Sequence, residues 1–170
     1  FMLQGINGRY VDEENAKKMR ERCMRLGLDI DGALNGLTLV EHPEQMPALE
    51  SGMYFDADIP VDVMQKEVGN YIKITGASFG KDRQMSGEMT KMGVNKATGM
   101  QRLMDELKIG REDTIAFGDG PNDVEMLQFA GTGVAMGNAI PAVKQYADMV
   151  TDKIDEDGLY HAFERLHLLG

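Results

Sequence analysis

The sequence predicts an α/β protein in two parts: a small α+β domain over residues 1–88, then a three-layer unit with a parallel sheet over residues 89–170. In the second part, short uncharged apolar runs alternate with amphipathic helices across short loops, as in a sheet covered on both faces. Strands that alternate with helices form parallel sheets with right-handed crossovers. The first part is less regular, because Pro43, Pro47 and Pro60 interrupt any long element. We therefore expect a domain boundary near residue 90.

The composition excludes several classes of partner. The chain has 170 residues, enough for one core of moderate size or two small domains. Its net charge of −10 argues against binding to nucleic acid or to an anionic membrane, since both require clustered Lys and Arg. No apolar run reaches membrane-spanning length, and residues 1–5 lack the basic start of a signal peptide. The single cysteine, Cys23, excludes an internal disulfide and favours a reducing compartment, so we expect a cytoplasmic protein.

The first part is expected to contain five regular elements. These are a strand and turn over residues 1–11, a helix over 12–26, a short strand over 52–55, a helix over 61–68 and a strand over 71–75. The helix over 12–26 begins with acidic residues and stops at Gly27, as the helix dipole and C-cap preferences favour. Residues 28–40 mix strand and turn signals, and residues 76–87 are polar and irregular.

The second part has a more regular pattern. We expect helices over 95–109, from about 121 to 130, over 140–147 and over 158–169, and strands over 114–117, 133–136 and 148–151. In the first of these helices the apolar residues Met100, Leu103, Met104 and Leu107 keep the 3.6-residue period of a helix.

Two aspartates follow the strand over 114–117. Asp119 comes directly after it and Asp123 four residues later, in a glycine-rich turn that begins a helix. Open α/β sheets bind their ligands at the carboxyl ends of the strands. Two carboxylates this close raise each other's pKa unless a cation lies between them, and oxygen ligands of this kind suit Mg²⁺. The alternative is structural, with Asp119 as a turn residue and Asp123 as a helix N-cap.

Lys96 lies in the first turn of the helix over 95–109, where a cation opposes the helix dipole. The lysine is therefore not placed to stabilise the helix. A cation beside the free N–H groups of a helix N-terminus is suited to bind phosphate. The alternative is a surface lysine whose ammonium group lies in water.

Several motifs, taken in order, resemble the haloacid dehalogenase (HAD) superfamily in its Cof-like branch of sugar-phosphate phosphatases. They are Gly93-Val-Asn-Lys-Ala-Thr-Gly-Met100, Gly118-Asp-Gly-Pro-Asn-Asp123 and Val134-Ala-Met-Gly-Asn138. Ile154-Asp-Glu-Asp-Gly158 is similar to the C-terminal run of that branch. The resemblance is strong over residues 91–170 and weaker, though compatible, over residues 1–90.

The resemblance implies a HAD-like Rossmannoid fold, with residues 1–88 as an α+β cap and 89–170 as the C-terminal half of the core. It implies a phosphatase for small phosphorylated metabolites such as sugar phosphates, with Mg²⁺ as cofactor and an aspartyl-phosphate intermediate. Asp119 and Asp123 would form the metal site, Asp119 as a ligand and Asp123 as support for the metal shell or its waters. Lys96 would offset charge on the nucleophile and the phosphoryl group, and Asn122 would hydrogen-bond nearby.

The nucleophile of this family is the first Asp of Asp-x-Asp-Gly-Thr-Leu after a buried strand. Asp29-Ile-Asp-Gly-Ala-Leu34 matches except at Ala33, and Tyr71-Ile-Lys-Ile-Thr-Gly76 could serve as the second motif. If both matches are genuine, the chain is a capless phosphatase with Asp29 as nucleophile and Asp31 as acid/base. We favour the opposite interpretation, because the six residues before Asp29 continue a helix. The chain would then lack the nucleophile-bearing half of the core, expose a sheet edge, and be inactive and poorly stable alone.

Proteins of other classes share some of these sequence features. A non-catalytic, acidic α/β module that holds a divalent ion or a phosphorylated ligand is the main alternative. A receiver-like signalling domain is weaker, since its acidic residues belong early in the chain. The phosphate-binding pattern Gly-x-x-x-x-Gly-Lys-Ser/Thr does not occur, which excludes that class of enzyme. His42, His161 and His167 lack the spacing of a zinc site.

Overall fold

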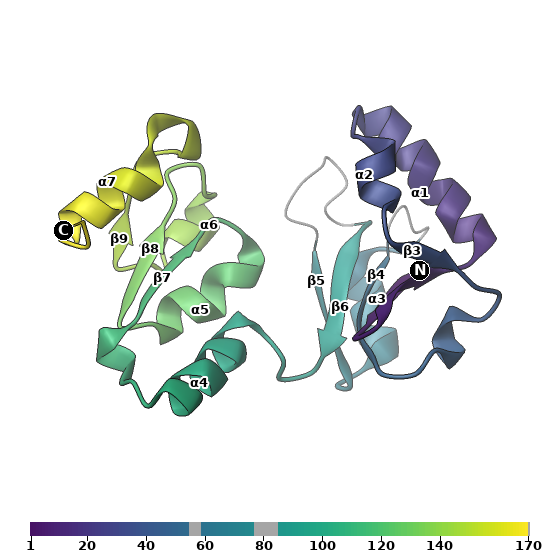
Figure 1. The fold of residues 1–170 in the computed structure, drawn as a ribbon, viewed down its shortest axis with the longest axis horizontal. Helices are drawn as coiled ribbons and strands as arrows, with labels where there is room; N and C mark the ends of the chain where they lie inside the picture. Colours follow the sequence, from purple (N-terminus) through teal and green to yellow (C-terminus); the bar gives the residue numbers. More distant parts are fainter. Residues whose placement is uncertain (55–58, 77–84, 170) are drawn as a thin grey trace. The chain divides into compact units, whose positions relative to one another are not determined.

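The computed structural model describes residues 1–54, 59–76 and 85–169. The chain divides into two compact units, Phe1–Met92 and Gly93–Gly170. Each unit has its own sheet and its own helices (Figure 1). The predicted α/β fold is confirmed, since parallel strands alternate with helices in the second unit. No helix within the described residues is both long and apolar enough to cross a membrane.

A six-stranded sheet in the order β3-β2-β1-β4-β6-β5 forms the first unit. Its strands are β1 (Met2–Gly5), β2 (Gly8–Val11), β3 (Leu37–Leu39), β4 (Leu49–Tyr54), β5 (Ile72–Gly76) and β6 (Gly87–Lys91). All neighbouring strands pair antiparallel except β2 and β3. The sequence patterns did not predict β6, which lies between β4 and β5. Residues 77–84 of the segment predicted to be irregular lie outside the described residues.

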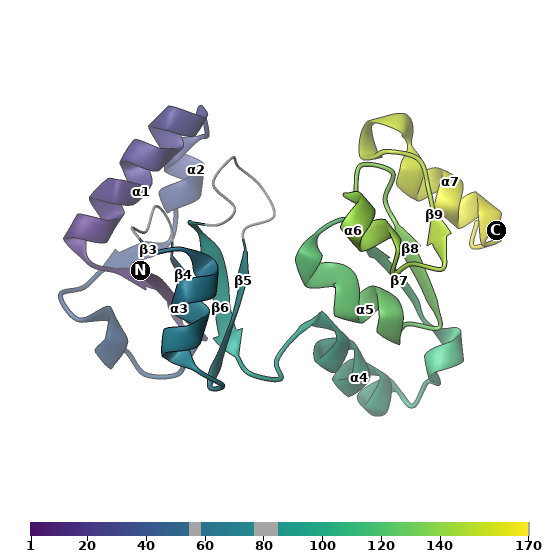
Figure 2. The same ribbon diagram turned by 180° about the vertical axis from the view of Figure 1, so that it is seen from behind.

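Three helices accompany this sheet: α1 (Glu13–Leu26), α2 (Ile30–Leu34) and α3 (Val61–Val68), with a 3₁₀ turn at Pro43–Gln45. Asp12 caps α1 by accepting the Asn15 N–H at 2.7 Å. Gly27 ends the helix at φ 65°, a left-handed conformation that favours glycine. Helix α3 packs on the sheet face that carries Tyr54, Ile74 and Met89. It lies behind the sheet in Figure 1 and in front of it in Figure 2.

The second unit contains a parallel sheet in the order β7-β8-β9. Its strands are β7 (Ile115–Gly118), β8 (Thr132–Ala135) and β9 (Met149–Val150). Its helices are α4 (Lys96–Leu107), α5 (Val124–Phe129), α6 (Pro141–Lys144) and α7 (Gly158–Arg165), with 3₁₀ turns at Arg111–Asp113, Pro121–Asp123 and Ile154–Glu156.

Both faces of this parallel sheet are covered. Val134 and Ala135 are neighbours in β8, so they point to opposite faces, and both are fully buried. Ala116 and Ala135 share the face that packs against α5 and α6. On the other face Phe163 of α7 stacks on Phe117 of β7, with ring centroids 5.3 Å apart. The sheet is therefore the middle of three layers.

One edge of the sheet and one side of α4 are open within the second unit. Among the described residues β7 pairs with a strand on one side only. Helix α4 packs against α5, and Met104 is buried there. The predicted helical period is present in α4, but Leu103 and Leu107 of its apolar stripe are 58% and 57% exposed. The apolar stripe of α4 is wider than its contact with α5, so these two leucines lie outside that contact.

Candidate active site

The turn that follows β7 is held by the carboxylate of Asp123. Its Oδ2 atom accepts the backbone N–H groups of Asp119 and Gly120, each at 2.9 Å. The Asp123 side chain is 5% exposed, so these bonds are shielded from water. A Cβ on Gly118 would lie 2.5 Å from the Cβ of Asp123, which explains the glycine at the end of the strand.

Lys96 and Asp123 are brought together across 27 positions of sequence. The Lys96 ammonium donates to Oδ1 of Asp123 and forms an ion pair with it. Lys96 is the first residue of α4, and Asn95 and Thr98 make a capping box at this helix start. Nearly half of the Lys96 side chain remains exposed, so its ammonium group lies at the surface of the site.

The pKa of Asp123 reflects these contacts. Burial by itself raises the pKa of the carboxyl, but the hydrogen bond from Lys96 and the two backbone N–H bonds outweigh burial and hold the pKa below its ordinary value. The carboxylate is therefore charged at neutral pH. Both of its oxygens have protein partners, which suits an orienting role better than direct coordination of a metal.

Asp119 is different, because its side chain is exposed. Its Oδ2 atom accepts the Asn138 Nδ2–H at 3.0 Å. Within the described residues no hydrogen bond is found at Oδ1. Asn122, in the same turn, is half-buried. The structure thus brings Lys96, Asp119, Asn122 and Asp123 to one end of the parallel sheet.

Magnesium fits this turn in part. No three His, Cys, Asp or Glu side chains of residues 1–54, 59–76 and 85–169 group closely enough to hold a metal ion. Mg²⁺ is commonly bound through one or two carboxylates, with water and substrate phosphate completing its shell. Asp119 satisfies that requirement with its open oxygen. Asp123, predicted as the second metal residue, fits the supporting role and not that of a direct ligand.

Asn138 belongs to the motif Val134-Ala-Met-Gly-Asn138, and the sequence did not predict it as a site residue. It follows β8, the strand parallel and adjacent to β7, with Ala135 paired to Gly118. The ends of neighbouring parallel strands meet at one edge, so the turn after β8 necessarily lies near Asp119. That adjacency is the signal that could have identified Asn138.

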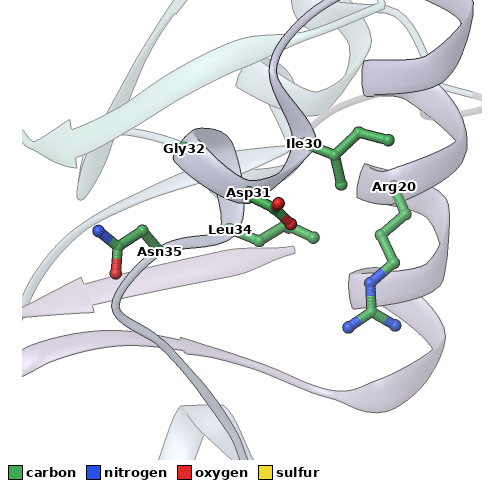
Figure 3. Close-up of a pocket in the computed structure, with 6 residues that line it drawn as sticks. All are labelled: Arg20, Ile30, Asp31, Gly32, Leu34 and Asn35. Carbon is green, nitrogen blue, oxygen red and sulfur yellow. The ribbon is translucent and has the colours of Figure 1, made fainter.

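Asp29 and Asp31 lie in the first unit, in a different setting. Asp29 follows α1 and Gly27 and caps the five-residue helix α2, accepting the Asp31 N–H at 3.2 Å. Both side chains are exposed. Asp31 lines an open pocket of about 580 Å³ with Arg20 of α1 and Asn35, shown in Figure 3. No strand leads into Asp29, although the interpretation of Asp29 as nucleophile requires a buried strand there.

The proposed second motif also has unexpected surroundings. Residues Ile72–Gly76 form β5, the edge strand of the first sheet, antiparallel to β6. A capless core would need this strand in a parallel sheet beside the nucleophile strand. The two matches therefore lack the structural context that their motifs require.

Comparisons with known proteins point to one family. Residues 43–163 match the family described as haloacid dehalogenase-like hydrolase. Two proteins of Bacillus subtilis strain 168 named 5-amino-6-(5-phospho-D-ribitylamino)uracil phosphatase are similar to this chain. YitU is 56% identical to it over 72 residues, and YcsE is 35% identical over 128 residues. These alignments cover 42% and 72% of this chain. Among solved structures, a HAD subclass IIB sugar phosphatase superposes with a TM-score of 0.76 at 25% identity.

The chain is shorter than each of these proteins. The matches cover 27% of YitU, 49% of YcsE and 60% of the sugar phosphatase chain, which in turn covers 99% of this chain. The chain therefore spans less than two thirds of each of these three proteins.

Proposed function

Because the chain belongs to the haloacid dehalogenase-like hydrolase family, we propose that it forms part of a Mg²⁺-dependent phosphatase for small phosphorylated metabolites such as sugar phosphates. The observation that carries this proposal is the pairing of Lys96 with the buried Asp123, beside the open carboxylate of Asp119. The similar B. subtilis proteins are named phosphatases, and the similar solved structure is a sugar phosphatase. Phosphoryl transfer needs little from a protein beyond positioning and well-placed cations, and this turn offers both.

Four residues of the candidate site have a role in this proposal. Asp119 holds Mg²⁺ through its open oxygen, and Asp123 holds the turn and keeps the Lys96 ammonium in place. Lys96 offsets the charge of the transferring phosphoryl group, and the Asn122 amide hydrogen-bonds to substrate or phosphate. Bound Mg²⁺ would neutralise phosphate charge, which this acidic chain of net charge −10 otherwise repels.

We further propose that residues 1–88 are a cap and residues 89–170 the C-terminal half of a HAD core. The division of the chain into units at Met92 and Gly93 supports this assignment. The open edge of β7 and the exposed Leu103 and Leu107 support a missing packing partner for the second unit.

The nucleophile, in this proposal, is a carboxylate outside these 170 residues. Its oxygen attacks phosphorus as the bond to the leaving oxygen breaks, and water then hydrolyses the aspartyl phosphate. Asp29 and Asp31 are exposed and follow a helix instead of a strand, which supports excluding them from this role.

The first test is hydrolysis of p-nitrophenyl phosphate by the 170-residue chain, with and without Mg²⁺. We expect no turnover by the chain alone. Mg²⁺-dependent turnover that is lost in both Asp29→Asn and Asp119→Asn would identify Asp29 as nucleophile and overturn the cap assignment.

In a second test, a related phosphatase supplies the other half of the core. Residues 93–170 replace the corresponding segment of YcsE, and phosphatase activity of the chimera is measured. We expect activity that falls at least a hundredfold with Lys96→Ala or Asp119→Asn, the scale of removing one group that stabilises transition-state charge. A folded chimera whose activity survives both substitutions would refute the assigned roles. A folded chain that binds Mg²⁺ while the folded chimera stays inactive would favour a non-catalytic binding module.

A further inference from the structure

The side-chain amide of Asn138 joins Asp119 to the C-terminal part of the second unit. Its Nδ2–H donates to Oδ2 of Asp119 at 3.0 Å, and its Oδ1 accepts the backbone N–H of Ile154 at 3.2 Å. One amide thus links two segments that are 35 residues apart in sequence, the turn after β7 and the 3₁₀ turn Ile154–Glu156. Both ends of the Asn138 amide are used, which fixes the orientation of its plane.

The backbone around Asn138 is held from several sides. Met136 donates its N–H to the Gly118 carbonyl at 2.9 Å, which continues the β7–β8 pairing to the turn. Gly137 donates to the Asp152 carbonyl at 3.0 Å, and its own carbonyl accepts the Lys144 ammonium at 2.6 Å. A Cβ on Gly137 would lie 2.6 Å from backbone atoms of Asp152 and Lys153, so the two segments are in close contact. Asn138 is therefore presented by a rigid turn.

Asp152 extends this support to the closing helix. Its Oδ2 atom accepts from Arg165 at 2.8 Å and lies 3.0 Å from Nδ1 of His161. Thr151 donates its hydroxyl hydrogen to the Gly158 carbonyl at 2.6 Å in a buried bond. These contacts anchor the segment from Thr151 to Gly158, which in turn presents the Ile154 N–H to Asn138.

We infer that Asn138 is a positioning residue that fixes the carboxylate of Asp119 for Mg²⁺ binding. The inference rests on the proposed function, because it takes Asp119 as the metal ligand. An exposed aspartate on a glycine-flanked turn loses rotamer freedom when it binds a cation, and Asn138 removes part of that cost in advance. It holds one oxygen and leaves the other open. Removing an outer hydrogen-bond partner of a metal ligand typically lowers metal affinity about 10- to 100-fold.

The test measures Mg²⁺ binding to the 170-residue chain. The ¹⁵N-labelled protein is titrated with MgCl₂ at constant ionic strength, and the amide signals of Gly118, Asp119 and Gly120 report occupancy. We expect Asn138→Ala to raise the Mg²⁺ dissociation constant about tenfold. Gln145→Ala is the matched control, since its amide donates to the Ala142 carbonyl within the α6 segment, and it should leave Mg²⁺ affinity unchanged.

The outcomes separate this inference from the function on which it rests. If the unsubstituted chain shows no Mg²⁺ response at this turn, the metal assignment of Asp119 fails and the inference fails with it. If the chain binds Mg²⁺ and Asn138→Ala binds it equally well, only the inference about Asn138 is overturned. A purely structural role would lower the melting temperature of Asn138→Ala without changing the Mg²⁺ dissociation constant.

A second variant covers the case in which Asn138→Ala does not fold. Asn138→Asp keeps the acceptor for Ile154 but places a negative charge against Oδ2 of Asp119. We expect a lower melting temperature without Mg²⁺ and a larger recovery on adding Mg²⁺ than for the unsubstituted chain. Gln145→Glu adds the same charge at an exposed position and should show no such recovery. Equal Mg²⁺ responses of the two variants would overturn the inference.

Discussion

Two turns of this chain carry a pair of aspartates beside glycine, and they differ in what precedes them. Asp119 and Asp123 follow β7, a strand of a parallel sheet that helices cover on both faces. Asp29 and Asp31 follow helix α1 and begin a five-residue helix at the surface of the first unit. In the first turn a carboxylate is buried and paired, and in the second both are exposed. Similar residues thus acquire different chemistry from the element that leads into them.

The physical cause of this difference is which acceptor binds the backbone N–H groups of each turn. After β7 the chain turns sharply, and the N–H groups of Asp119 and Gly120 point at one buried oxygen of Asp123. Such a turn forms a charged, oriented site that a lysine can complete. At α2 the Asp29 carboxylate accepts one exposed N–H, the ordinary function of a helix cap.

The largest expected effect comes from removing Asp123. Asp123→Ala leaves two N–H groups without an acceptor and Lys96 without its partner, so the second unit should lose about 3 kcal/mol of stability. Amide hydrogen exchange in β8 measures this, because those amides exchange when the second unit opens. Asp123→Asn, which keeps the shape and one acceptor, should lose about half as much. A loss below about 1 kcal/mol for Asp123→Ala would contradict the buried network.

The two glycines beside these aspartates test whether the environments differ in rigidity. A Cβ at Gly118 would meet the Cβ of the buried Asp123 at 2.5 Å, whereas one at Gly32 would meet the Oδ2 atom of the exposed Asp29 at 2.5 Å. Asp123 cannot move away, so Gly118→Ala should destabilise the second unit by about 2 kcal/mol. Asp29 can rotate into solvent with loss of its cap bond, so Gly32→Ala should cost no more than about 1 kcal/mol. Amide hydrogen exchange in each unit measures the loss of stability of each variant. Equal losses would show that the two turns do not differ in rigidity.

Local signals predicted much of the fold. Asp12 and Gly27 marked the ends of α1, and the structure has the helix between them. Strand β6 was not predicted, since Gly87-Glu-Met-Thr-Lys91 carries one buried apolar side chain, Met89, and owes its place to pairing with β4 and β5. Long-range pairing of this kind leaves little trace in a single segment.

The candidate site was likewise predictable only where it depends on a single segment of sequence. The position of Asp119 after a buried strand was predictable from the apolar run before it. The pairing of Lys96 with Asp123 depends on how α4 packs against α5, which the helical pattern of neither segment specifies. Asn138 required the knowledge that β8 is the neighbour of β7. Sequence patterns thus located the elements, and packing between them determined which polar groups meet.

The dependence of stability on acidic pH should distinguish the ion-paired carboxylate of Asp123 from the other carboxylates of the chain. Because the pKa of Asp123 is held below its ordinary value, the stability that it contributes is present above its unfolded pKa of about 3.9 and is lost as pH falls through the lower folded value. Lys96→Met removes one of the groups that lower this pKa, so the acid-dependent loss of stability should be smaller and should be complete at higher pH. Melting of the second unit, followed by the methyl signals of Val134 between about pH 2 and pH 6, measures this shift.

The matched control for that measurement is Arg102→Met, which removes a cation from the exposed side of the same helix. It changes the net charge by the same amount but leaves the pair of Lys96 and Asp123 intact. If both variants move the acid transition equally, the effect arises from net charge, and the ion pair has no special role.

The smallest expected effect is at Asp29, and it tests the other side of the comparison. A helix cap is lost with alanine and kept with asparagine, so Asp29→Ala should weaken α2 by about 1 kcal/mol and Asp29→Asn by almost nothing. Hydrogen exchange of the α2 amides, starting at Asp31, measures both. A nucleophile would not show this order, since asparagine abolishes an attacking carboxylate as completely as alanine does, while preserving the cap. Loss of p-nitrophenyl phosphate turnover in Asp29→Asn, with α2 intact, would therefore reverse the roles of the two turns.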